Sequence, residues 1–231
     1  MMKVGIISGT SIARSGIFDN MELQVTSTPY GEIDFKEANG IVVINRHGFR
    51  HPLPPHRTNY RGYAHLLKKK GVETTLSLNS VGSLDEDLLP GSLVSCSDYV
   101  SFAPITFIDD APSAFAPSID NRLLDRLEPS LSRQIVKDRI YAQTRGPRFE
   151  TKAEVRILQK WGCDVVGMTF ANECDLLLES GISVTSLCMI DNFAHGIGSY
   201  KLSYDLFRNL VDENQKIVDE VLEVAVELFH A

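Results

Sequence analysis

The chain lacks an apolar run long enough to cross a bilayer, and it lacks an excess of positive charge. A membrane-spanning helix needs about 20 consecutive apolar residues, and no segment of the 231 residues approaches that length. The formal net charge of −7 argues against a general nucleic-acid binder, because phosphate backbones demand a basic surface. The first strand-like pattern begins almost at the N-terminus and leaves no room for a signal peptide. We therefore expect a cytoplasmic protein that binds neither membranes nor nucleic acid.

The few cysteines show no spacing typical of a metal or redox site. None of the four forms a CxxC pair, and no histidine lies at zinc-ligand spacing from any of them. We interpret them as buried free thiols in a reducing cytoplasm. They are Cys96, Cys163, Cys174 and Cys188.

What the chain does contain is an alternation of short apolar runs with helical patterns. The hydrophobic fraction of 43% is enough for one full core. Six apolar runs are expected to be mostly buried strands: Val4–Ile7, Ile41–Asn45, Thr74–Asn79, Leu93–Cys96, Val165–Met168 and Val184–Ile190. Four helices are expected at Asn59–Lys70, Thr151–Trp161, Asn172–Ser180 and about Tyr204–Phe229. The repeated order of helix, glycine and strand is typical of α/β layers around a central sheet.

No linker, repeat or low-complexity tract interrupts this pattern, so we expect one domain over residues 1–231. Thr151 and Glu154 have the spacing of a capping box, which predicts a helix start at Thr151. The stretch from 102 to 118 is rich in Pro, Ala and Asp and has no periodicity. Its length predicts a loop with a role at a site or an interface.

Polar residues that suit an anion follow several of the expected strands. Gly9 and Thr10 come after the first strand, where backbone N–H groups and a hydroxyl can approach an anion closely. Arg46 and His47 end the next strand, and arginine binds phosphate through two parallel hydrogen bonds. Ser80 offers a further hydroxyl at the end of the third. Since open α/β sheets bind ligands at the carboxyl ends of their strands, these residues indicate an anion site, although each segment alone also fits an ordinary turn or loop.

A second group of residues suits a flat heterocycle and a sugar. Phe149 and Glu150 directly precede a helix, where the carboxylate could serve a ligand or simply stabilise the helix dipole. Met168 and Thr169 end a strand and offer a soft apolar wall and a hydroxyl, with core packing as the alternative for the methionine. Asn192 follows a long apolar strand. Its amide can donate and accept at once, or it can be an ordinary strand-ending turn residue.

The order and spacing of these segments resemble the trimeric nucleoside phosphorylases, the family of purine nucleoside phosphorylase and methylthioadenosine phosphorylase. The resemblance to the methylthioadenosine phosphorylase branch is carried by Gly9-Thr10, Thr28-Pro29-Tyr30-Gly31, Arg46-His47-Gly48, Pro54-Pro55-His56-Arg57, Asn59-Tyr60-Arg61, Asn79, Val81-Gly82-Ser83, Gly146-Pro147-Arg148-Phe149-Glu150-Thr151, Ala153-Glu154 and Gly167-Met168-Thr169. It covers nearly the whole chain apart from about residues 102 to 140.

The resemblance implies a three-layer αβα fold with a central mixed sheet, and an enzyme that splits a purine nucleoside with phosphate into free base and sugar 1-phosphate. It implies no metal and no organic cofactor, since inorganic phosphate is a co-substrate. It also implies a homotrimer or a dimer of trimers, with sites near the subunit contacts.

Roles for individual residues follow from the same resemblance. Five residues would form the phosphate site: Thr10, Arg46, His47, Ser80 and Thr169. Met168 would pack on the ribose, with Tyr60 nearby. Three residues would face the base: Phe149, Glu150 and Asn192. Catalysis would rest on Asn192, Glu150 and Arg46.

Hydrogen-bond polarity favours a 6-oxopurine such as hypoxanthine or guanine. An ionised Glu150 only accepts hydrogen bonds, so it suits the N1–H of a 6-oxopurine and repels the bare N1 of adenine. Asn192 can donate to O6 and accept from a protonated N7. Adenine-specific relatives usually carry an aspartate and a small hydroxyl residue at these two places. If the strand end were shifted by one residue, Asp191 would face the base and adenine would return as the candidate, as in methylthioadenosine phosphorylase.

Two departures from the family pattern stand out. Asn172 occupies a place where relatives generally have proline, so we expect the turn from Phe170 to Glu173 to differ. The segment from 102 to 137 is shorter than in typical relatives, and no histidine there matches the group that a neighbouring subunit adds near the 5′ end of the sugar. These departures motivate a further hypothesis, a non-catalytic nucleoside-binding homologue.

The substituent at the 5′ position of the sugar stays open between the hydroxyl of inosine or guanosine and the methylthio group of methylthioinosine. Four apolar residues could wall a methylthio pocket or belong to the core of the last helix: Leu202, Leu206, Phe207 and Leu210. His195 could reach a 5′ hydroxyl or lie in a surface loop.

Overall fold

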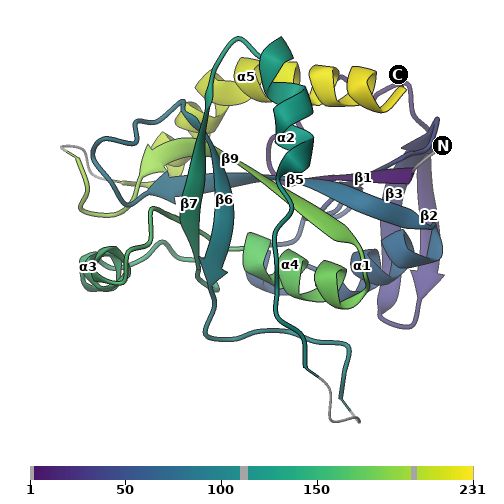
Figure 1. The fold of residues 1–231 in the computed structure, drawn as a ribbon, viewed down its shortest axis with the longest axis horizontal. Helices are drawn as coiled ribbons and strands as arrows, with labels where there is room; N and C mark the ends of the chain where they lie inside the picture. Colours follow the sequence, from purple (N-terminus) through teal and green to yellow (C-terminus); the bar gives the residue numbers. More distant parts are fainter. Residues whose placement is uncertain (1–2, 110–113, 199–201, 231) are drawn as a thin grey trace.

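One mixed sheet of nine strands forms the centre of the molecule (Figure 1). The computed structural model describes residues 3–109, 114–198 and 202–230. The strands lie in the order β2-β3-β4-β1-β5-β8-β7-β6-β9, and β5 also pairs with β9. Their bounds are β1 (Lys3–Ser8), β2 (Leu23–Thr28), β3 (Gly31–Ala38), β4 (Ile41–Asn45), β5 (Val72–Ser83), β6 (Leu93–Val100), β7 (Ile135–Gln143), β8 (Val165–Gly167) and β9 (Ser183–Phe193).

Helices cover both faces of the sheet, as the three-layer αβα prediction requires. Figure 1 shows α5 and α2 on one face and α1 and α4 on the other, with α3 at one end. Their bounds are α1 (Tyr60–Lys69), α2 (Arg122–Leu127), α3 (Lys152–Lys160), α4 (Phe170–Glu179) and α5 (Tyr204–His230), with short 3-10 turns η1 (Pro55–Arg57) and η2 (Glu128–Ser130). The two main hydrophobic clusters lie on opposite faces, one under α1 and α4 and the other under α2 and α5.

The pairing of the strands brings several strand ends to one edge of the sheet. β1 runs parallel to both β4 and β5, and β5 runs parallel to β9. Because β9 also pairs with β6, the strands β5, β8, β7, β6 and β9 close into a ring. Carboxyl ends of parallel strands point the same way, so the segments that follow β1 and β4 emerge beside the stretch of β5 that follows Ser77.

The helix boundaries follow the capping signals in the sequence. The side chain of Asn59 accepts a hydrogen bond from the N–H of Gly62 at the start of α1. The helix stops before Gly71, whose φ of 73° is a conformation that glycine adopts at little cost. At α3, Thr151 and Glu154 make both bonds of the predicted capping box. All six predicted strands and all four predicted helices are present.

Three strands and one short helix escaped prediction because their sequences are not continuous apolar runs. Along β2, half-buried and exposed residues alternate, and β7 carries several charged residues. The segment Phe170–Glu173, described in the sequence analysis as a turn, forms the first turn of α4, which begins at Phe170, and Asn172 lies within it.

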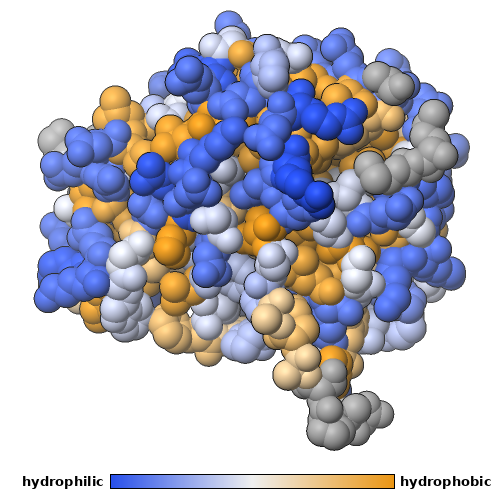
Figure 2. Space-filling model, viewed as in Figure 1, coloured by the Kyte–Doolittle hydropathy of each residue, from blue (hydrophilic) through white to orange (hydrophobic). Residues whose placement is uncertain are grey.

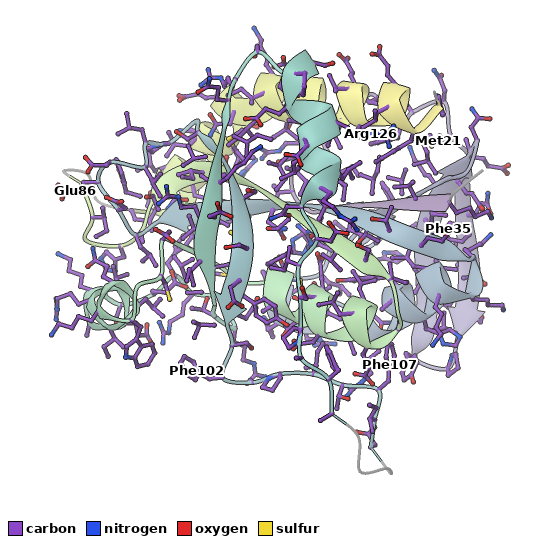
Figure 3. All side chains as sticks on the ribbon, viewed as in Figure 1. Met21, Phe35, Glu86, Phe102, Phe107 and Arg126 are labelled. Atoms are coloured by element: carbon purple, nitrogen blue, oxygen red, sulfur yellow. The ribbon has the colours of Figure 1, made fainter. Side chains whose placement is uncertain are left out.

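The remaining expectations concern the long loop and the cysteines. The described residues between β6 and α2 form no helix or strand, as predicted for this loop. Figure 3 shows its Phe102 and Phe107 below the sheet, and the loop is held to α4 by hydrogen bonds from Ile105 N to Asp175 and from Phe107 N to Glu179. All four cysteines are free and buried, as expected. In the described part of the chain, none of the helices combines the length and the apolar character of a membrane span.

Candidate active site

A single cavity of about 310 Å³ gathers the predicted site residues from strand ends that are distant in sequence. It is lined by nine of the ten residues that the sequence singled out: Thr10, Arg46, His47, Ser80, Phe149, Glu150, Met168, Thr169 and Asn192. Tyr60 is the exception. Polar residues from β1, β4 and β5 therefore share one space with the aromatic ring and the carboxylate that precede α3.

Arg46 is buried and is held in place by several protein groups. Its Nε and Nη2 donate to the two carboxylate oxygens of Glu173, at 2.6 and 3.2 Å, and its Nη1 donates to the carbonyl of Leu78 at 3.0 Å. Burial lowers the pKa of Arg46, but the Glu173 carboxylate outweighs this and leaves the pKa raised. The side chain is thus a fixed cation. Since Nη1 carries two hydrogens, one of them stays available to an anion in the cavity.

Gly9 explains how an anion can come close to this cation. A Cβ atom at Gly9 would lie 3.2 Å from Nη1 of Arg46 and 3.0 Å from the ring of His47. Any other residue would therefore crowd both side chains. The absence of a side chain at position 9 keeps open the approach to the guanidinium and the imidazole.

His47, predicted at the phosphate, lies beside Arg46 in the cavity wall but carries no charge. Burial and, to a smaller extent, the neighbouring Arg46 lower its pKa to about 4, so the imidazole is neutral at pH 7. Its Nδ1 is buried and has no hydrogen-bond partner among the described residues. A neutral imidazole donates through one nitrogen and accepts through the other. His47 can therefore offer a hydrogen bond to an anion but not a positive charge.

Asn79 is a cavity residue that the sequence analysis quoted without assigning a role. It is buried within β5, and its Oδ1 accepts a hydrogen bond from Oγ1 of Thr169 at 3.2 Å. Its Nδ2 donates to Ser77. Asn79 thus orients the Thr169 hydroxyl. Its position directly before Ser80 was the only signal available in the sequence.

The register question at the end of β9 has a clear structural answer. Opposite β5, Val81 pairs with Ile190 and Gly82 pairs with Asn192, so Asp191 is the extra residue of a bulge. Asn192 lines the cavity, whereas Asp191 does not.

The Asp191 carboxylate is instead held behind the cavity wall. Its Oδ2 accepts from the Ser80 hydroxyl, and its Oδ1 accepts from Nδ2 of Asn214 on α5 at 3.0 Å. Burial raises the pKa of Asp191 to about 6, while the bonds from Ser80 and Asn214 and the charge of Arg14 oppose the rise. The Ser80 hydroxyl, expected at the phosphate, is therefore committed to Asp191 in this structure.

Glu150 and Asn192 form the opposite end of the cavity. Glu150 is 5% exposed, and its Oε1 accepts a hydrogen bond of 2.7 Å from the Thr144 hydroxyl. Burial raises the pKa of Glu150. Asn192 uses its Nδ2 once, in a bond of 2.7 Å to the Phe193 carbonyl, which leaves its oxygen and its second N–H for a ligand.

The segment that carries Glu150 is fixed from both sides. Next to it, Thr151 begins α3 with the capping box. Nδ1 of His195 lies 3.0 Å from the backbone carbonyl of Glu150, so this histidine supports the loop. The exposed Arg148 pairs with Glu154 at 2.7 Å, outside the cavity. The carboxylate of Glu150 is thus positioned without a cation bound to it among the described residues.

Tyr60, expected beside the ribose, is not part of the cavity wall. Its hydroxyl donates to the carbonyls of Pro55 and Met168, at 3.2 and 3.3 Å. Pro55 and Met168 both line the cavity. Tyr60 therefore shapes the wall through the backbone of these two residues.

The start of α5 closes the cavity on one side. Phe207 and Tyr204 belong to its wall, and the Phe207 ring packs edge-on against Phe149 with centroids 5.8 Å apart. Of the four apolar residues named for a pocket or a core, only Phe207 lines the cavity. None of the four belongs to a hydrophobic core cluster. In residues 3–109, 114–198 and 202–230, no group of three or more His, Cys, Asp or Glu side chains could hold a metal ion.

Comparison with known proteins identifies the family. Residues 3–227 match the family model of the phosphorylase superfamily, and the chain belongs to this superfamily. It is 38% identical to the probable S-methyl-5′-thioinosine phosphorylase of Methanocaldococcus jannaschii, over 95% of this chain and 90% of that protein. It is 35% identical to the probable 6-oxopurine nucleoside phosphorylase of Archaeoglobus fulgidus, over 97% of this chain and 94% of that protein.

Solved structures agree with the predicted fold. The methylthioadenosine phosphorylase of Schistosoma mansoni in complex with adenine superposes with a TM-score of 0.83 at 26% identity, over 100% of this chain and 92% of that one. The family resemblance in the sequence and the prediction of a three-layer αβα fold with a mixed sheet are thereby confirmed.

Proposed function

We propose that the chain is a pentosyltransferase that splits a 6-oxopurine nucleoside with phosphate, giving free base and a ribose or methylthioribose 1-phosphate. The names of its relatives agree with the reaction that the sequence analysis predicted. The choice of base rests on one observation: Glu150 and Asn192 both lie in the wall of the same cavity.

The proposed chemistry follows from how charge develops in the reaction. As the bond from C1′ to the base nitrogen breaks, its electron pair stays on the purine and the sugar becomes cation-like. A phosphate oxygen then bonds to C1′. Arg46, neutral His47 and the Thr10 hydroxyl hold the phosphate against this cation, which stabilises the transition state. The Thr169 hydroxyl, expected at the phosphate, already donates its proton to Asn79, as the Ser80 hydroxyl does to Asp191. The purine takes up one proton and hydrogen phosphate releases one, so charge balances without a covalent enzyme intermediate.

Hydrogen-bond polarity at the base end supports a 6-oxopurine. The Glu150 carboxylate has no bound cation among the described residues, so when ionised it seeks a donor such as N1–H. Asn192 can donate its free N–H to O6 while its oxygen accepts from a protonated N7. The competing hypothesis of an adenine-directed enzyme placed Asp191 at the base, but that carboxylate binds Ser80 and Asn214 instead. Adenine N1 would leave the buried Glu150 without a donor.

For the 5′ end of the sugar, the aromatic wall favours a methylthio group over a hydroxyl. We assign Phe207 to this end of the sugar, where it packs edge-on against Phe149 of the base side, and the exposed Tyr204 lies 6.2 Å from Phe207 between ring centroids. A hydroxyl buried against these rings would lose hydrogen bonds to water, whereas a thioether gains contact with them.

The proposal includes no metal and no organic cofactor, with inorganic phosphate as co-substrate, and a cytoplasmic homotrimer or dimer of trimers. An exposed aromatic pair suits a contact between subunits: Phe102 is 69% and Trp161 is 55% exposed, with ring centroids 5.1 Å apart. Figure 2 shows apolar residues interspersed with polar ones over one face of the molecule. Sedimentation of the purified protein would give its oligomeric state.

The decisive experiment measures release of free base from four nucleosides, with and without phosphate: inosine, methylthioinosine, adenosine and methylthioadenosine. We expect phosphate-dependent release of hypoxanthine, fastest from methylthioinosine. Cleavage of the adenosine compounds alone would reject the choice of base. Purine binding in a calorimeter without turnover of any nucleoside would instead support the non-catalytic homologue.

A further inference from the structure

One side chain outside the cavity contacts Glu150, the carboxylate that we propose binds the base. Thr144 follows β7 directly, and its hydroxyl donates to Oε1 of Glu150 at 2.7 Å. In the described part of the chain it is the only side chain that donates a hydrogen bond to this carboxylate. Thr144 is not in the cavity wall, so it acts on a ligand only through Glu150.

The Thr144 bond makes the two carboxylate oxygens unequal. Oε1 accepts the Thr144 proton, and no described side chain donates a hydrogen bond to Oε2, so we assign Oε2 to the base. When Glu150 is ionised, Oε2 accepts from the N1–H of a 6-oxopurine. When Glu150 is protonated, its proton lies on Oε2, since Oε1 is already accepting, and the carboxyl group then donates to the bare N1 of adenine.

Among the side chains around Glu150, Thr144 is the one whose hydrogen bond favours the ionised carboxylate. Burial raises the pKa of Glu150 most, the Thr144 hydroxyl and the backbone N–H of Glu150 itself lower it, the negative charge of Glu154 raises it and Arg148 lowers it. Arg148 is itself bound to Glu154, through hydrogen bonds of 2.7 and 2.8 Å. From the loop after β9, His195 faces only the backbone carbonyl. A hydrogen bond to a charged acceptor is stronger than one to a neutral acceptor, so Thr144 stabilises the carboxylate.

Thr144 is also rigidly mounted. Its backbone N–H donates to the Gly167 carbonyl at 2.8 Å, and its own carbonyl accepts from Nε2 of Gln143 at 2.8 Å. The Gly167 carbonyl is a second acceptor for the hydroxyl, but at 3.4 Å it is the weaker one. The hydroxyl is therefore aimed at Glu150.

We propose that Thr144 is a positioning residue for base specificity: its hydroxyl holds the Glu150 carboxylate ionised with Oε2 toward the base, and so selects 6-oxopurines over 6-aminopurines. This inference rests on the proposed function. The proposal also predicts a second activity that depends on pH. At acid pH Glu150 is protonated and donates a hydrogen bond to N1 of adenine, so adenine nucleosides become substrates.

The test compares wild type, Thr144→Val and Thr144→Ser, with Thr26→Val as control. Thr26 is a half-buried residue of β2, at the far edge of the sheet. For each protein, kcat and KM are measured with methylthioinosine and methylthioadenosine from pH 5 to 9. In wild type, kcat/KM for the 6-oxo substrate should fall toward acid pH while that for the 6-amino substrate rises. The ionised form exists above the pKa of Glu150, so losing the Thr144 bond should move this crossover to higher pH.

At pH 7, Thr144→Val should lower the preference for the 6-oxo substrate by about 10- to 100-fold, since a hydrogen bond to a charged group is worth about 1.5–3 kcal/mol. Thr144→Ser should restore both the preference and the pH profile, and Thr26→Val should match wild type. An unchanged crossover in Thr144→Val, or an equal loss with both substrates, would overturn the proposal.

Calorimetric titration with hypoxanthine and adenine separates this proposal from the proposed function. Wild type that binds hypoxanthine but releases no base from any nucleoside would contradict the enzymatic function alone. The ratio of the two affinities in Thr144→Val would still decide the role of Thr144: a ratio that falls toward one supports it, and a ratio equal to that of wild type refutes it.

Discussion

Glu173 and Glu150 are both buried beside the same cavity, yet their surroundings are opposite. Glu173 accepts hydrogen bonds from Arg46, from the Tyr63 hydroxyl at 2.9 Å and from the Ser77 hydroxyl at 2.5 Å. Glu150 accepts one side-chain hydrogen bond, from Thr144. One carboxylate is surrounded by donors that β4, α1 and β5 supply, and the other has most of its acceptor capacity unused.

This difference separates a carboxylate that fixes a protein side chain from one that, under the proposed function, is free to bind the base. A buried charge is tolerated when it is paired and hydrogen-bonded, so Glu173 compensates the buried charge of Arg46 and fixes its guanidinium. A buried carboxylate with few donors is a strong acceptor for any ligand that brings one. Arg46 combines both kinds of contact, because most of its N–H groups donate to the protein and one N–H is left for an anion.

The largest expected effect is at the paired carboxylate. Glu173→Gln leaves the Arg46 charge buried without its partner, so we expect the free energy of unfolding to fall by about 3–5 kcal/mol. Phosphate affinity should fall with it, since the guanidinium is no longer fixed. Urea unfolding and the KM for phosphate measure the two effects. Asp125→Asn, at an exposed ion pair, is the control and should leave both unchanged. A Glu173→Gln protein as stable as wild type would refute the role given to this pair.

In contrast to Glu173→Gln, the substitution Glu150→Gln should cause a large loss of activity and no loss in the free energy of unfolding. Burial raises the pKa of Glu150, so its ionised form costs stability above the pKa of the unfolded chain, and a neutral amide removes that cost. The amide can turn its N–H to adenine N1. We therefore expect kcat/KM for 6-oxo substrates to fall about 10²-fold and the preference to move toward 6-amino substrates. Steady-state kinetics and urea unfolding of the same preparation check both parts. A protein that loses stability without changing its base preference would contradict this account.

Much of this cavity can be anticipated from strand ends, because an apolar run followed by polar residues close to a glycine marks where a strand leaves the sheet. Thr10, Arg46 and Thr169 were found in this way and do line one cavity. The sequence does not predict which hydrogen-bond donors of these residues are bound by the protein and which stay available to a ligand. The Glu173 partner of Arg46 lies 127 residues away, and only the packing of α4 against the sheet brings the two together.

The bulge at Asp191 illustrates the same limit. It depends on how two strands that are remote in sequence are paired, so the choice between Asp191 and Asn192 required the register of β9 against β5. The strands β2, β3 and β7 were missed for a simpler reason, since exposed or charged positions interrupt their apolar pattern. Tyr60 was assigned by resemblance alone, and its hydroxyl turned out to bind backbone carbonyls.

A third buried carboxylate extends the comparison to pH. Asp191 has a pKa raised to about 6 by burial, against about 3.9 in an unfolded chain, so the folded state holds its proton more tightly. The resulting penalty is absent below about pH 4, grows as pH rises through 6 and is constant above. It amounts to about 2–3 kcal/mol. Asp191→Asn should abolish this part of the pH dependence. Urea unfolding of both proteins from pH 4 to 8 tests it, and parallel curves would refute it.

The smallest expected effect tests whether Asn192 or Asp191 of the bulge binds the base. It also tests whether groups with unused hydrogen-bonding capacity are the ones that face the ligand. Asn192 keeps its oxygen and one N–H free at the cavity, so Asn192→Asp removes a donor to O6 and adds an acceptor that suits a 6-amino group. We expect the ratio of kcat/KM for 6-oxo over 6-amino substrates to fall about tenfold. Asp191→Asn is the matched control, because its carboxylate is occupied by Ser80 and Asn214, and it should leave the ratio unchanged. If Asp191→Asn moved the ratio and Asn192→Asp did not, the residue facing the base would be Asp191, and adenine would again be the favoured base.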